Sequence, residues 1–102
     1  MKYRWEIINR LIEKYGYKSY LEIGVKDGVC FSSVICTRKT GMDIKPLIVK
    51  SGVYKMSSDE FFDKQQGQKK FDIIFIDGAH HEEQVDQDIQ NSLKSLADGG
   101  KS

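Results

Sequence analysis

The stretch that most constrains the fold of this chain is SYLEIGVKDGVC, residues 19–30, which combines a strand, a glycine loop and a helix start. Its short apolar run is interrupted by one acid, Glu22, and is followed by glycines at positions 24 and 28. Gly24 lets the chain turn tightly and lets a ligand approach the backbone, and we expect unpaired amides after Gly28. The pattern is typical of a nucleotide-binding loop, although an ordinary strand-to-helix turn can also use two glycines.

The loop differs from the dinucleotide-binding pattern GxGxxG at its middle glycine. Lys26 stands at that position, so that the sequence is ExGxxxG. In the dinucleotide pattern, that glycine lets the backbone approach the pyrophosphate. The loop therefore favours a less anionic adenosine ligand over a dinucleotide such as NAD.

The second strong signal is FDIIFID, residues 71–77. Its unbroken apolar run over residues 73–76 is what a central parallel strand, buried on both faces, requires. A polar cluster, DGAHH, follows at residues 77–81. From Glu82 we expect a helix, with Gly99 and Gly100 as its end.

The remaining segments alternate between helix and strand patterns. Apolar residues at helical spacing predict a helix over residues 4–15 that ends at Gly16. We then expect a short helix over 29–36, a strand over 40–44, a helical turn over 47–50, a weak edge strand over 52–56, and a helix starting at Ser57 and Ser58. This alternation predicts an α/β fold, a Rossmann-like three-layer sandwich with a mainly parallel sheet.

A strand order of 3-2-1-4 would make the first and fourth strands neighbours where the winding reverses. Ligands bind there, outside the carboxyl ends of the strands, so Gly24 and Asp77 would converge. Asp43 stands at the end of the second strand, 19 residues after Gly24. A carboxylate about 20 residues beyond the loop can accept both ribose hydroxyls. The alternative for Asp43 is a solvated turn acid before Pro46.

The composition excludes several classes of protein. The chain has 16 Lys plus Arg against 15 Asp plus Glu and no basic run, which gives no electrostatic footprint for nucleic acid. Cys30 and Cys36 fit neither a CxxC nor a metal-binding spacing, and two cysteines are too few for a disulfide scaffold. We therefore expect a reduced, cytoplasmic protein. Charges interrupt the segment MKYRWEIINRLIEKY, which predicts neither a signal peptide nor a membrane span.

Three features together resemble the class I S-adenosylmethionine-dependent methyltransferases. They are ExGxxxG at residues 22–28, an acid ending the second strand, and FDIIFIDGAH at residues 71–80, followed by an acidic helix and ADGG. The match looks closest to the branch whose fourth strand ends in IDGxH, which includes small-molecule and sugar O-methyltransferases. The resemblance covers roughly residues 17–100. It implies S-adenosyl-L-methionine as the cofactor and a small-molecule or sugar hydroxyl as the methyl acceptor.

The resemblance also implies roles for single residues. Glu22 and Gly24 would border the methionine end of the cofactor, and Gly28 would permit close helix approach. The segment 56–59 lies where the family lines the adenine, with a serine, Ser57, in place of the usual acid. The candidate cofactor-binding residues are therefore Glu22, Gly24, Lys26, Gly28, Asp43, Ser57, Ser58 and Asp77.

For the chemical step, the resemblance implies His80 and Asp77 as catalytic residues. A histidine that titrates near neutrality suits the removal of a proton from a hydroxyl nucleophile. Asp77 could also hold Mg²⁺, which would lower the pKa of that hydroxyl, although one carboxylate alone does not make a magnesium site. A histidine after a strand is more often structural than catalytic, so His80 has that interpretation as well.

A complete enzyme of this class has a seven-stranded sheet, whereas this chain stops at Ser102, where a fifth strand should begin. We therefore expect residues 1–102 to be a single, incomplete cofactor-binding domain whose fourth strand is an exposed apolar edge. One alternative is a noncatalytic Rossmann-like module that forms homo-oligomers, or binds a partner, through that edge. Another is an NAD-binding oxidoreductase domain, which the missing middle glycine opposes.

Overall fold

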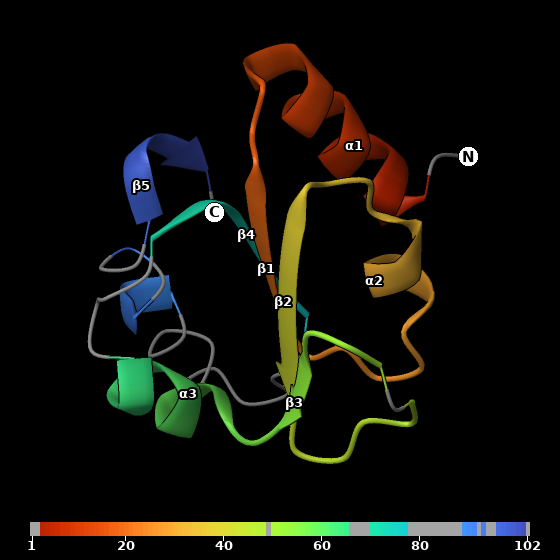
Figure 1. Cartoon of the computed structure of the whole chain (residues 1–102), viewed down its shortest axis with the longest axis vertical. Helices are drawn as coiled ribbons and strands as arrows, with labels where there is room; N and C mark the ends of the chain where they lie inside the picture. The colour runs from red at the N-terminus through yellow and green to blue at the C-terminus, as the bar shows by residue number, and fades with distance from the viewer. Residues whose placement is uncertain are drawn as a thin grey trace.

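The computed structural model describes residues 3–48, 50–65, 70–77, 89–91, 93 and 96–101. The elements, shown in Figure 1, are α1 (Arg4–Tyr15), β1 (Ser19–Ile23), α2 (Val29–Ser33), β2 (Arg38–Asp43), β3 (Val53–Lys55), α3 (Ser58–Gln65), β4 (Phe71–Ile76) and β5 (Leu96–Lys101). Most of the helix predicted from Glu82, together with His80 and His81, lies outside the described residues. In the described ranges, no helix is long and apolar enough to cross a bilayer.

Within the described residues, five strands form one parallel sheet in the order β3-β2-β1-β4-β5. Leu21, in the middle of β1, lies opposite Thr40 of β2 on one side and Ile74 of β4 on the other. The predicted α/β class, the order 3-2-1-4 and the neighbouring first and fourth strands are confirmed. Because β1 is hydrogen-bonded on both sides and covered on both faces, all five of its residues are buried.

The expectation that the fourth strand is an exposed edge is wrong. β5 pairs with β4 in parallel, with Phe71 opposite Leu96 and Ile73 opposite Lys101. Gly99 and Gly100, which we predicted as the end of a helix, lie in this strand. Two adjacent glycines carry no side chains whose periodicity could have indicated a strand. β4 is therefore paired on both sides and does not supply the open edge on which we expected a homo-oligomer or a partner to assemble, while association itself stays a prediction.

Alternate residues of β1 face two different helical layers, as the pleat of a strand requires. Tyr20 faces α1 and α2, in a core cluster with Ile8, Ile12, Val25, Cys30, Phe31, Val34 and Ile73. Leu21 and Ile23 face α3, in a second cluster with Met42, Phe61, Phe62, Phe71 and Ile74. In Figure 1, α1 and α2 lie on one side of the sheet and α3 on the other. The predicted three-layer sandwich is therefore confirmed.

Each of the first two helices ends for a physical reason that the structure shows: a left-handed glycine for α1 and side-chain hydrogen bonds for α2. α1 ends at Gly16, which adopts the left-handed conformation (φ 66°), as predicted. α2 ends at Ser33, earlier than predicted, because Asn9 of α1 binds the chain there: its Nδ2 donates to the Ser33 carbonyl (3.0 Å) and its Oδ1 accepts from the Ile35 N–H (2.7 Å). Val34 is buried, whereas Ile35 is 77% exposed.

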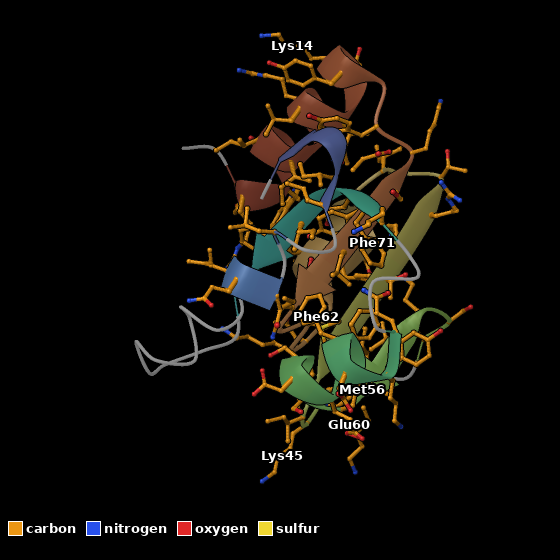
Figure 2. All side chains as sticks on the ribbon, turned by 90° about the vertical axis from the view of Figure 1, so that its left-hand side faces the viewer. Lys14, Lys45, Met56, Glu60, Phe62 and Phe71 are labelled. Carbon is orange, nitrogen blue, oxygen red and sulfur yellow. The ribbon has the colours of Figure 1, made fainter. Side chains whose placement is uncertain are left out.

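The segment between β2 and α3 follows the expected pattern only in part. The helical turn predicted over residues 47–50 does not form at the described positions 47, 48 and 50. β3 forms the edge strand as expected, and Ser57 precedes α3, where its Oγ accepts the N–H of Glu60 (3.1 Å). Figure 2 shows Phe62 pointing from α3 toward the sheet, while Glu60 lies on the outer side of the helix.

Side-chain hydrogen bonds join the amino ends of β1 and β4. Oδ2 of Asp72 accepts the N–H groups of Lys18 (2.7 Å) and Ser19 (3.2 Å). In return, Oγ of Ser19 accepts the N–H of Asp72 (3.0 Å). Bonds to an ionised acceptor are stronger than neutral ones. They help fix the register that brings the other ends of the two strands together.

We predict that Asp72→Ala lowers the free energy of unfolding by about 1–2 kcal/mol, because two backbone N–H groups lose their acceptor. Urea denaturation would measure the change. Asp63→Ala is the matched control, since Asp63 is an exposed acid on α3, and its effect should stay within about 0.5 kcal/mol. Equal losses in the two variants would contradict a register-fixing role for Asp72.

Candidate functional site

The carboxyl ends of β2, β1 and β4 lie side by side and lead into Asp43, Gly24 and Asp77. The N–H of Gly24 donates to the carbonyl of Met42 in β2 (2.8 Å), and the N–H of Asp77 donates to the carbonyl of Ile23 in β1 (2.8 Å). Parallel pairing thus continues just beyond the strands. Gly24 and Asp77 lie at the same edge of the sheet, as the predicted topology requires.

The loop after β1 has an unusual backbone conformation. Gly24, Lys26 and Gly28 all have positive φ angles, of 90°, 57° and 80°. Lys26 is the only non-glycine residue with a positive φ in the described part of the chain. A side chain in this conformation costs about 1 kcal/mol, and such residues gather at functional sites. Two hydrogen bonds hold Lys26 there: its N–H donates to Oδ2 of Asp43 (2.7 Å), and its carbonyl accepts the N–H of Leu47 (2.9 Å).

Lys26 connects the two acids of the site. Its backbone binds Asp43, while its Nζ lies 3.8 Å from Oδ2 of Asp77. This residue occupies the position of the missing middle glycine, and its side chain lies over the end of β4. The structure therefore places Asp43, Lys26 and Asp77 in one line across the carboxyl ends of β2, β1 and β4.

Asp43 is held in a fixed orientation at the end of β2. Its Oδ2 accepts the Lys26 N–H (2.7 Å) and its Oδ1 accepts the Lys45 N–H (3.0 Å). Each carboxylate oxygen has two lone pairs, so each can accept one further hydrogen bond. The carboxylate is thus positioned to accept two neighbouring hydroxyl groups of a ligand.

Asp77 forms an ion pair that the sequence did not indicate. Nη1 of Arg4, at the start of α1, contacts Oδ2 of Asp77, and the Arg4 guanidinium lies 6.0 Å from the centre of the Phe75 ring. The side chains of Arg4 and Asp77 are 49% and 31% exposed, so water screens the pair and leaves it accessible to a ligand. Arg4 belongs to no motif, and the helical pattern of α1 gave no signal for its role.

The described residues do not fit a magnesium site at Asp77. Mg²⁺ prefers several oxygen ligands, whereas the side chains that form ion pairs with Asp77 in the described ranges are the cations Arg4 and Lys26. No group of three His, Cys, Asp or Glu residues in the described ranges could hold a metal. His80, the predicted base, lies outside the described residues.

Glu22 is buried beneath the loop rather than exposed at the strand ends. It is 1% exposed, and its Oε1 accepts a hydrogen bond from the Tyr20 hydroxyl (2.6 Å). Burial raises the pKa of Glu22, while its hydrogen bonds with Tyr20 and Cys30 lower it by less. Burial, with Glu22 as a second cause, raises the pKa of the Cys30 thiol to about 12. The acid inside a strand thus has internal partners, and its predicted cofactor contact stays a prediction.

Gly28 makes room for a side chain from the segment after β2. A Cβ at this position would lie 2.2 Å from Cδ1 of Ile48. The N–H of Val29, which we expected to be unpaired at the helix start, donates to Oδ1 of Asp27 (3.1 Å). The expectation of unpaired amides is therefore corrected for Val29. A helix start that is covered by Ile48, and whose first N–H is bound by Asp27, is not arranged to receive a phosphate.

A cavity of about 440 Å³ opens beside the ends of β2 and β3. It is lined by Lys45, Pro46, Ile48, Val53 and Lys55. Ser57 and Ser58 follow β3, with the Ser57 hydroxyl capping α3 and Ser58 buried. A larger cavity of about 600 Å³ lies near the amino ends of β1 and β2, lined by Asn9, Ile12, Glu13, Gly16, Tyr17, Lys18, Ile35, Cys36 and Thr37. It contains no residue of the predicted site, so we assign the site to the carboxyl edge.

Comparison with known proteins identifies the family and the fold of this chain. A family model described as a methyltransferase domain matches residues 21–101. Two solved structures of MycE methyltransferase from the mycinamycin biosynthetic pathway are similar in fold, one in complex with Mg, SAH and mycinamycin VI (TM-score 0.68) and one with Mg and SAH (TM-score 0.67). Both are 17% identical in sequence, and the alignments cover 93% of this chain but only 31% and 30% of those chains. Comparison with curated sequences finds no match.

We predict that Glu22→Gln removes a pH dependence from the stability of the protein. The pKa of folded Glu22 lies above its ordinary value of 4.5, so the stability that Glu22 contributes is fully present below about pH 4.5 and is lost as pH rises through the folded pKa. The variant cannot ionise, so its free energy of unfolding should rise relative to that of the wild type as pH increases above about 4.5 and through the folded pKa of Glu22. Urea denaturation across this range measures the difference, and the exposed Glu13→Gln is the control. Parallel curves for wild type and Glu22→Gln would refute it.

We also predict that Gly28→Ala destabilises the protein by about 2–4 kcal/mol, because it adds overpacking against Ile48 to the cost of a left-handed alanine. Gly16→Ala is the matched control, since Gly16 is also left-handed (φ 66°) but has no atom within 4 Å of an added Cβ. That control should lose about 1–2 kcal/mol. Thermal or urea unfolding gives both values, and equal losses would show that Ile48 does not restrict this position.

Proposed function

Because the chain belongs to the class I S-adenosylmethionine-dependent methyltransferase family, whose domain model matches residues 21–101, we propose that it binds S-adenosylmethionine for methyl transfer to a small-molecule or sugar hydroxyl. The observation that carries this proposal is the line of Asp43, Lys26 and Asp77 across three neighbouring strand ends. Along this line lie the oriented carboxylate of Asp43, the turn at Gly24, which has no side chain, and the charged side chains of Lys26 and Asp77. The cofactor has a ribose, a sulfonium and an amino acid in the same order, so each part can face one of these groups.

Asp43 is the proposed partner of the ribose. Both of its oxygens keep a lone pair after binding the backbone of Lys26 and Lys45. The adjacent cavity has apolar walls from Pro46, Ile48 and Val53, which suit a planar base. We place the adenine there, with Ser57 and Ser58 next to it at the start of α3.

We propose that the backbone of Gly24 lies directly beneath the sulfur of the bound cofactor. When bound, the cofactor supplies an electrophilic methyl group on a sulfonium. The chain holds it by the strand ends and leaves the backbone of Gly24 free of a side chain, with φ at 90°. We propose His80 as the group that takes the proton of the acceptor hydroxyl, a role worth about 100- to 10,000-fold in rate. No step requires a metal at Asp77.

The geometry supports this cofactor over a dinucleotide. A pyrophosphate needs a glycine at the middle of the loop and free amides at the helix start. Here Lys26 occupies the first position, and Ile48 and Asp27 occupy the second. The MycE structures, which contain SAH, share the fold over 93% of this chain. The chain spans about a third of their length, so the acceptor is proposed only as a chemical class.

The test is the binding of S-adenosylhomocysteine, measured by isothermal titration calorimetry and by the shift of the melting temperature. We expect the wild type to bind and to melt at a higher temperature with the ligand, and Asp43→Asn to bind at least tenfold more weakly because an amide offers one acceptor oxygen. Asp63→Asn, on the exposed side of α3, should bind like the wild type. The proposal fails if the wild type binds NADH but not S-adenosylhomocysteine, or binds neither.

A further inference from the structure

We propose that Arg4 and Lys26 bind the α-carboxylate of the cofactor's amino-acid end, and that Asp77 binds its α-ammonium group. This inference rests on the proposed function and adds a residue from α1 to the cofactor site. Arg4 lies outside residues 21–101, the range that the methyltransferase-domain model matches. The family match therefore assigns nothing to it.

The three charged side chains come from three elements and meet at one point. Arg4 begins α1, Lys26 lies in the loop after β1, and Asp77 directly follows β4. Both cations approach the same oxygen, Oδ2 of Asp77, with Nζ of Lys26 at 3.8 Å and Nη1 of Arg4 in direct contact. Arg4 and Lys26 are each 49% exposed on their side chains, so a ligand can reach them.

The cluster carries two positive charges and one negative charge, which complements a zwitterion. A carboxylate inserted between Arg4 and Lys26 receives two charge-assisted contacts, and the planar guanidinium can bind it through two parallel N–H groups. The ammonium group then takes the place of the cations at the Asp77 carboxylate. The exchange replaces the Arg4–Asp77 ion pair with two new pairs of opposite charge, one between the ligand carboxylate and the two cations and one between the ligand ammonium and Asp77. No charge is left without a partner.

The surroundings hold each member of the cluster in place. The N–H of Asp77 is bonded to the carbonyl of Ile23, one residue before Gly24. The Arg4 guanidinium lies 6.0 Å from the centre of the Phe75 ring, within reach of a cation–π interaction. Lys26 is fixed by its N–H bond to Asp43, the proposed ribose acceptor. A ligand with its ribose on Asp43 and its sulfur over Gly24 would therefore place its amino-acid end at this cluster.

The experiment compares two ligands that differ at this end. S-adenosylhomocysteine has the α-carboxylate and α-ammonium groups, whereas 5′-methylthioadenosine lacks both. Calorimetric titration of Arg4→Gln should show a dissociation constant for S-adenosylhomocysteine at least tenfold higher than that of the wild type. The constant for 5′-methylthioadenosine should change less than about twofold, because that ligand does not reach Arg4. Lys26→Gln should show the same selective loss.

Arg10→Gln is the control, since Arg10 is an exposed arginine on the same helix, and it should leave both dissociation constants unchanged. Melting temperatures without ligand check that each variant is folded. Equal losses for both ligands in Arg4→Gln, or no loss for either, would overturn the inference while the proposed function stands. Equally tight binding of the two ligands by the wild type would overturn the inference in the same way. Binding of neither ligand by the wild type would overturn the proposed function and this inference with it.

Discussion

The parallel pairing of β1 with both β2 and β4 is the constraint on which the rest of this structure depends. It buries every residue of β1 and aligns the carboxyl ends of three strands. Hydrogen bonds from Gly24 to β2 and from Asp77 to β1 extend the alignment beyond the strands. A different neighbour for β1 would separate Asp43 from Asp77, and no single ligand could then reach both.

The burial of β1 creates a second requirement: the strand contains an acid, Glu22, and a buried acid needs a hydrogen-bond partner. Glu22 is hydrogen-bonded by Tyr20, and burial favours its neutral form. A buried polar group without a partner would cost about 1–3 kcal/mol, so the Tyr20 hydroxyl matters for the stability of the central strand. With its side chain turned into the core, Glu22 leaves the surface above β1 to the loop that follows. The charged groups that a ligand can reach at this edge are then those of Lys26, Asp77 and Arg4, together with Asp43 at the end of β2.

Lys26 shows how one strained residue can serve several contacts. Its left-handed conformation directs its N–H to Asp43, its carbonyl to Leu47 and its side chain to Asp77. A glycine would adopt this backbone at lower cost but would offer no charge. Together with Ile48 over Gly28, this residue distinguishes the loop from one that receives a pyrophosphate. The same loop sequence that first indicated a nucleotide site therefore also narrows the class of nucleotide.

The sequence by itself determined those helices and strands whose local residue pattern indicates which positions are buried and where the element begins or ends. The apolar runs of β1 and β4, the helical spacing and Gly16 of α1, and the serine start of α3 each follow from local pattern, and strand alternation then predicted the sheet order. Only the tertiary structure decided that Gly99 and Gly100 lie in a strand, that Asn9 ends α2 and that Arg4 meets Asp77. Arg4 and Asp77 are 73 residues apart, and their contact depends on how α1 crosses the sheet. Local periodicity fixes which face of an element is buried, but not which distant side chain it meets.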